Sequence, residues 1–157
     1  MASLNDANQT VLTLASIYET TPDDVEVIIV DDCSATPLVH YIKQDGRTKL
    51  VTNRFRCGCG PSRHIGAMRA TGNWIFIVDS HVRFKRDWFD EWKKLRGDKT
   101  DEDFNSTLFC ATCLGITSKQ MDIEKSTSVY HGATLNLYGP DRNKPSAPYQ
   151  VYEAVWM

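Results

Sequence analysis

Runs of apolar residues alternate with amphipathic segments along the first hundred positions of the chain. Residues 25–30 and 74–78 are almost entirely apolar, which is typical of strands buried on both faces of a parallel sheet. Apolar residues recur at helical spacing in the segments around these runs. We predict strands at residues 25–30, 49–52, 74–78 and within 105–116, helices at 6–19, 38–43, 61–70 and 87–96, and β character at 128–138 before a polar loop at 139–148. Alternating strands and helices indicate an α/β fold, with a mostly parallel sheet and helices on both of its faces.

The first predicted helix follows a candidate N-cap residue, which is either Asn5 or Asp6. Its apolar residues form one stripe, and this stripe predicts the face that packs against the sheet. The stripe consists of Val11, Leu14, Ala15 and Tyr18 and is widened by Leu12 and Ile17.

Composition places the chain among ordinary globular proteins. It has 157 residues, enough for one domain with a sizeable core, and its net charge of −2 gives no electrostatic footprint for nucleic acid. No apolar run approaches the roughly 20 residues that span a bilayer, and the N-terminus lacks a secretory signal pattern. We therefore expect a cytoplasmic protein whose five cysteines are reduced.

Acidic residues follow two of the predicted strands, at Asp31-Asp32 and at Asp79-Ser80-His81. The carboxyl ends of parallel strands meet at one edge of a sheet, where ligands bind in α/β folds. Asp79 and His81 alternate along an extended chain, so they can offer one oxygen and one nitrogen to a divalent ion such as Mn²⁺. One carboxylate of the other pair can accept the N3–H of a uracil ring, which cytosine lacks. The simpler alternative is that these residues only begin turns.

Two segments together resemble a known family. VEVIIVDDCS (25–34) and SRHIGAMRATGNWIFIVDSH (62–81) are similar to the nucleotide-binding half of family-two glycosyltransferases of the GT-A fold. The Asp79-Ser80-His81 motif resembles the Asp-x-His motif of the polypeptide N-acetylgalactosaminyltransferases. The resemblance covers residues 2–83 and implies a Rossmann-like GT-A fold, with transfer of a sugar from a UDP-sugar to an acceptor that the sequence does not identify.

The resemblance also implies a set of site residues. Asp32 would contact the uracil, Arg63 the diphosphate or the neighbouring carboxylates, and Leu4 would lie where the uridine is held. Asp79 and His81 would bind the metal, Mn²⁺ or alternatively Mg²⁺. The complete donor-binding set implied is Leu4, Asp31, Asp32, Arg63 and Asp79. The Asp-x-His motif favours retention over inversion, and no catalytic base is assigned.

The chain departs from the family pattern at both ends. Residues 1–6 match only the end of the family's first strand, so this strand is expected to be largely missing and the chain to be truncated. We predict a single domain, with a nucleotide-binding core at 1–116 and an incomplete acceptor-side region at 117–157. An incomplete parallel sheet exposes unpaired backbone groups, which favours self-association.

Two alternatives to an enzyme stay open. The chain can be a non-catalytic module that binds a nucleotide or a partner. It can also be a structural zinc domain, in which Cys57, Cys59, Cys110 and Cys113 supply four thiolates.

Overall fold

The computed structural model describes residues 1–97 and the strands at 110–115, 128–130 and 154–156, within two compact units, Met1–Phe84 and Lys85–Met157. The first unit contains three strands, two α-helices and one 3-10 helix. In chain order these are β1 (Ala2–Ser3), α1 (Ala7–Thr20), β2 (Val27–Asp31), η1 (Leu38–His40), β3 (Thr48–Thr52) and α2 (Cys59–Ala67).

The sheet of the first unit is parallel, with the strand order β1-β2-β3. β2 lies in the centre and all five of its residues are buried. Val27 pairs with Thr48 and Asp31 with Thr52 on one side, while Ala2 pairs with Val30 on the other. The prediction of a parallel sheet is therefore confirmed, and β1 is only two residues long, as expected.

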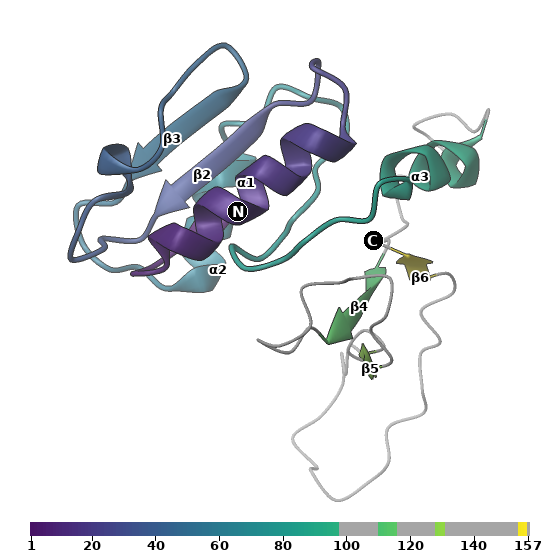
Figure 1. Ribbon diagram of the computed structural model, residues 1–157. Coiled ribbons are helices and arrows are strands. Elements are labelled where there is room, and N and C mark those ends of the chain that lie inside the picture. The colour runs from purple at the N-terminus through teal and green to yellow at the C-terminus, as the bar shows by residue number, and fades with distance from the viewer. Residues whose placement is uncertain (98–109, 116–127, 131–153, 157) are drawn as a thin grey trace, which may run out of the picture. The chain divides into compact units, whose positions relative to one another are not determined.

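Helices cover both faces of this sheet. Figure 1 shows α1 in front of β2 and α2 behind it. On the α1 face, the hydroxyl groups of Ser3 and Thr10 form a hydrogen bond of 2.8 Å. On the α2 face, Gly66 approaches the side chains of Ile28 and Val30 so closely that a Cβ atom there would lie 3.3 Å from Val30 Cγ2. The predicted α/β architecture is confirmed on this point as well.

We expect Gly66→Val to lower the free energy of unfolding by about 1–3 kcal/mol, because its side chain would overpack the fully buried Val30. Gly60→Val is the matched control on the same helix, since nothing lies within 4 Å of a Cβ atom at that position. Urea unfolding of both variants measures the difference. Equal loss of stability in the two variants would contradict the close approach of α2 to β2.

The strand predicted at residues 74–78 is wrong. Within the described part of the chain, these residues form no strand, and the only pairing nearby is an isolated parallel bridge between Ala2 and Asp79. Ile75 and Ile77 are 53% and 59% exposed. The physical reason is the length of β1, because a two-residue strand offers a pairing partner to Asp79 and to nothing before it.

The buried face predicted for the first helix is confirmed only at Ile17 and is otherwise wrong. α1 buries Thr10, Thr13, Ser16 and Ile17, whereas Val11 and Leu12 are 37% and 45% exposed. Helical periodicity of apolar residues misses this face because its hydroxyl groups have buried hydrogen-bond partners elsewhere in the chain. Asp6 occupies the predicted N-cap position, but its carboxylate makes no capping hydrogen bond.

The second unit contains α3 (Trp88–Arg96), β4 (Cys110–Gly115), β5 (Ser128–Tyr130) and β6 (Ala154–Trp156). Its strand order is β5-β4-β6, with β5 antiparallel and β6 parallel to β4. The predictions of a helix at 87–96 and of a strand within 105–116 are confirmed, whereas the polar loop predicted at 139–148 lies outside the described residues. The predicted division of the chain at residue 116 stays a prediction. Among the described helices, none has the length and apolar character that crossing a membrane requires.

Candidate functional site

Asp31 ends β2 and shapes the turn that follows it. Its side chain is fully buried, and its two carboxylate oxygens accept hydrogen bonds from the backbone N–H of Ser34 at 2.9 Å and of Leu38 at 2.8 Å. This pattern lets the chain reverse direction after β2 without leaving buried donors unpaired. The predicted donor contact of Asp31 stays a prediction.

The carboxylate of Asp32 is buried and accepts hydrogen bonds from the loop before α2. Its Oδ1 accepts hydrogen bonds from Asn53 Nδ2 at 2.9 Å and from the backbone N–H of Cys57 at 2.8 Å, and its Oδ2 accepts one from Gly58 N–H at 2.8 Å. Burial acts to raise the pKa of Asp32, but these hydrogen bonds, with one from Ser62, outweigh it and lower the pKa to about 2. The carboxylate thus occupies the N–H groups of Cys57 and of the N-cap residue Gly58, where a helix N-terminus favours an anion.

The loop after β1 is tied to the loop after β2. Asn5 has a left-handed backbone, with φ of 54°, and its N–H donates to Ser34 Oγ at 2.9 Å. Its side-chain oxygen accepts a hydrogen bond from the N–H of Ala35 at 2.8 Å. Leu4, which is half-buried, therefore lies in a fixed loop at the carboxyl edge of the sheet.

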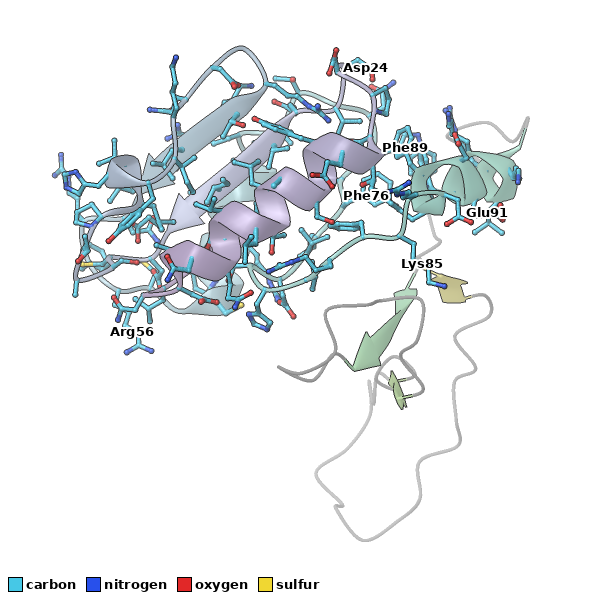
Figure 2. The ribbon with its side chains drawn as sticks, viewed as in Figure 1. Asp24, Arg56, Phe76, Lys85, Phe89 and Glu91 are labelled. Atoms are coloured by element: carbon cyan, nitrogen blue, oxygen red, sulfur yellow. The ribbon has the colours of Figure 1, made fainter. Side chains whose placement is uncertain are left out.

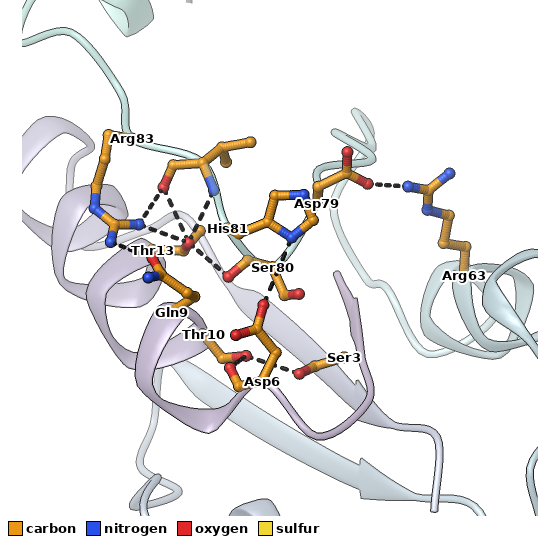
Figure 3. Close-up of polar contacts among 11 residues, drawn as sticks. Ser3, Asp6, Gln9, Thr10, Thr13, Arg63, Asp79, Ser80, His81 and Arg83 are labelled. Atoms are coloured by element: carbon orange, nitrogen blue, oxygen red, sulfur yellow. Dashed lines mark hydrogen bonds and ion pairs between the residues drawn. The ribbon is translucent and has the colours of Figure 1, made fainter. Parts of the chain in front are cut away.

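Two side-chain contacts that involve carboxylates lie at the same edge of the sheet. Arg63 of α2 pairs with Asp79, and the His81 ring nitrogen Nδ1 lies 3.6 Å from a carboxylate oxygen of Asp6, just before α1 (Figure 3). The Asp79 and His81 side chains are 49% and 63% exposed, so a ligand can reach both of them. Arg63 Nε is buried and has no hydrogen-bond partner within the described residues.

The chemistry of Asp79 and His81 fits a divalent cation of the Mn²⁺ type, which accepts mixed oxygen and nitrogen ligands. In the part of the chain that the structure describes, no group of three or more His, Cys, Asp or Glu side chains is arranged to hold a metal. These two residues would therefore leave most of the coordination shell to a bound ligand and water. A cation at Asp79 would also replace Arg63 as the partner of this carboxylate, which would free the guanidinium for an anionic ligand.

Several residues of this edge were not predicted from the sequence. Asn53 follows β3 and donates to Asp32, and Asp6 faces His81. The position of Asn53 at the carboxyl end of a strand is a signal that could have identified it. The basic residue Arg56 lies in the loop before α2, and its side chain extends outward into solvent (Figure 2).

The cysteines give no support to the zinc alternative so far as they are described. Cys33, Cys57 and Cys59 are free thiols. Cys110 and Cys113 lie in β4, and their side chains are outside the described residues. The four-thiolate zinc site stays a prediction.

Comparison with known proteins agrees with this geometry. The family model described as Glycosyl transferase family 2 matches residues 1–95. The chain is 34% identical to EpsH of Bacillus subtilis (strain 168) over 92 residues, which cover 56% of this chain and 26% of that protein. It is 35% identical to the succinoglycan biosynthesis protein ExoO of Rhizobium meliloti (strain 1021) over 82 residues, covering 51% of this chain and 24% of ExoO.

The chain is also similar to an animal protein that is named as a polypeptide N-acetylgalactosaminyltransferase, the family whose Asp-x-His motif Asp79-Ser80-His81 resembles. It is 34% identical to polypeptide N-acetylgalactosaminyltransferase 4 of Mus musculus over 98 residues, which cover 57% of this chain and 17% of that protein. The matched regions span about a quarter or less of the length of these relatives. The family model, by contrast, matches well over half of the present chain, together with the sheet edge described above. The chain belongs to Glycosyl transferase family 2.

Proposed function

We propose that this chain is the nucleotide-binding portion of a glycosyltransferase that takes a sugar from a UDP-sugar and uses a divalent metal ion. The observation that carries the proposal is the group of Arg63, Asp79 and His81 at the carboxyl edge of a parallel sheet, in a chain of a glycosyltransferase family. An accessible carboxylate, an imidazole and a guanidinium suit a metal–diphosphate group.

Asp79 and His81 would hold the metal, probed here as Mn²⁺ with Mg²⁺ as the second choice. A bound metal ion supplies Lewis-acid stabilisation of the charge on a departing diphosphate. Arg63 would donate hydrogen bonds to the same phosphate oxygens, because its guanidinium already lies beside Asp79. No described residue is assigned as a catalytic base.

The uridine would lie between the loop at Leu4 and the end of β2. We keep Asp32 as the acceptor for the uracil N3–H, which rests on the family resemblance. The carboxylate already accepts hydrogen bonds from Asn53, Cys57 and Gly58, so one of these donors would have to share it with the base.

Calorimetric titration of the chain with UDP and with CDP, each with and without Mn²⁺, tests this proposal. A charged hydrogen bond to the base contributes about 1.5–3 kcal/mol, so UDP is expected to bind about tenfold tighter than CDP or better. Removing Mn²⁺ with a chelator is expected to abolish most of the binding. Equal affinity for the two nucleotides would overturn the uracil assignment, and metal-independent binding would overturn the metal assignment.

A donor-hydrolysis assay with UDP-sugars separates an enzyme from a binding module. Release of UDP that depends on Mn²⁺ supports a glycosyltransferase. Tight Mn²⁺–UDP binding without any hydrolysis favours a module that binds the nucleotide and does not transfer the sugar. Light scattering of the same sample tests the predicted self-association.

A further inference from the structure

The chain that follows Asp79 is fastened to α1 by buried hydroxyl groups. Thr13 Oγ1 lies 2.8 Å from the carbonyl oxygen of Ser80 and 2.9 Å from that of Val82. It also accepts a hydrogen bond of 3.2 Å from the N–H of Val82. The Thr13 side chain is fully buried, so water cannot replace these bonds.

These contacts bracket His81. A hydroxyl group has one proton, so Thr13 donates to one of the two carbonyl groups at a time and accepts from the N–H beside them. The partners, Ser80 and Val82, are the residues on either side of His81. Thr13 therefore holds the backbone both before and after the imidazole, and Figure 3 shows these bonds converging on its hydroxyl group.

Neighbouring residues of α1 hold the rest of the same segment. Arg83 Nη1 donates to Thr13 Oγ1 at 3.2 Å, and Arg83 Nη2 donates to Gln9 Oε1 at 2.8 Å. Ser16 Oγ accepts a hydrogen bond of 2.8 Å from the N–H of Phe84. Ser16 therefore fixes the backbone at Phe84 in the same way as Thr13 fixes the backbone around His81.

The fixed turn determines where the two exposed side chains of the edge lie. The His81 side chain is 63% exposed, and its Nδ1 lies 3.6 Å from a carboxylate oxygen of Asp6, so its ring is held only loosely by other side chains. Its position relative to Asp79 depends mainly on the backbone between them. That backbone is held in place by Thr13.

We propose that Thr13 is a positioning residue, which sets the backbone around His81 so that this imidazole and Asp79 can bind one metal–diphosphate ligand. The inference rests on the proposed function and adds a residue to it that touches neither the metal nor the nucleotide. Residues that orient metal ligands typically change metal affinity by about 10–100-fold when they are replaced.

The test compares three single variants by titration of Mn²⁺ in the presence of saturating UDP. Thr13→Val keeps the shape of the side chain and removes the hydroxyl group, and we expect it to weaken Mn²⁺ binding about tenfold or more. Thr13→Ser keeps the hydroxyl group and is expected to restore affinity close to that of the parent. Ser16→Ala is the matched control, because it removes one buried hydroxyl from the same helix face without touching the residues beside His81.

A second set of titrations asks whether Thr13 acts through His81. In a His81→Ala background, Thr13→Val is expected to cause little further loss of Mn²⁺ affinity. Equal losses of Mn²⁺ affinity in Thr13→Val and Ser16→Ala would overturn the inference. So would a Thr13→Val loss that is the same with and without His81, because either result would indicate a general effect on folding. Should Thr13→Val not fold, Thr13→Cys provides the comparison, since a thiol bonds more weakly than a hydroxyl group.

Amide hydrogen exchange separates this inference from the proposed function. The Val82 amide is expected to exchange faster in Thr13→Val than in Ser16→Ala, whether or not a metal binds. If the parent chain binds no Mn²⁺–UDP, the proposed function is overturned. The exchange rates then test separately whether Thr13 fixes the turn. Unchanged exchange of the Val82 amide in Thr13→Val would overturn this role of Thr13.

Discussion

Asp32→Ala is expected to lower the free energy of unfolding by about 3 kcal/mol or more, because each buried donor left unpaired costs about 1–3 kcal/mol. Asp32 is only 3% exposed, and removal of its carboxylate leaves the N–H groups of Cys57 and Gly58 without their acceptor. Urea unfolding at neutral pH measures this effect.

Asp45→Ala is the matched control for this variant. The Asp45 carboxylate also accepts hydrogen bonds from two backbone N–H groups, those of Arg47 and Thr48, but it lies at an exposed turn. Water can replace the carboxylate there, so the expected loss is much smaller than for Asp32→Ala. Similar losses at the two sites would show that burial of Asp32 contributes little.

The contribution of Asp32 to stability is expected to depend on pH. Its pKa in the folded chain is about 2, below the ordinary value of 3.8. A lowered pKa means that the contribution is fully present above about pH 4 and is lost as the pH falls toward 2. The difference in unfolding free energy between the parent and Asp32→Ala should therefore shrink over this range. A difference that stays constant on acidification would contradict the hydrogen-bonded carboxylate.

Asp79→Asn is expected to weaken Mn²⁺-dependent binding of UDP by tenfold or more, which corresponds to about 1.4 kcal/mol or more. The variant keeps the size of the side chain and removes the charge that a divalent cation requires. Its effect on stability should be small, because the ion pair with Arg63 is half-exposed and such pairs contribute about 0–1 kcal/mol. A large loss of binding with an unchanged unfolding curve is thus the expected pattern.

His81→Ala and Asp90→Asn complete the comparison with Asp79→Asn. Loss of the imidazole is expected to weaken binding less than loss of the carboxylate, because a neutral ligand contributes less charge. Asp90 is an exposed carboxylate of α3 that pairs with Lys93, so its replacement is expected to leave binding unchanged. Parental affinity in both Asp79→Asn and His81→Ala would contradict the metal site.

The central strand and its acidic end could be predicted from the sequence, because a run of apolar residues that is buried on both faces leaves little choice of conformation. The conformation of residues 74–78 could not be predicted in this way, although this run is equally apolar and forms no strand. A strand needs a partner of matching length, and β1 offers only Ala2 and Ser3. Whether a segment forms a strand thus depends on its partner as well, and the pattern of that segment alone does not predict it.

The polar interactions of the site show the same limit. The position after a strand predicted a ligand-binding carboxylate at Asp31-Asp32, and the family resemblance pointed to Asp32. The bonds of Asp32 to Asn53 and Gly58 depend instead on the path of a distant loop. Thr13 lies between Leu12 and Leu14, and the periodicity of apolar residues does not mark it as a buried position. Its burial follows from the course of residues 80–84 across α1, which no local pattern reveals.

The fastening of residues 80–84 to α1 has a consequence for the order in which the chain folds. Thr13 and Ser80 are separated by 67 residues, and Ser16 and Phe84 by 68. Contacts between such distant residues close long loops and form late. During synthesis, when N-terminal segments emerge from the ribosome first, α1 and β2 are available well before their last partner. The hydroxyl groups of Thr13 and Ser16 therefore stay hydrated until residues 80–84 have emerged, and only then can the first unit complete its packing.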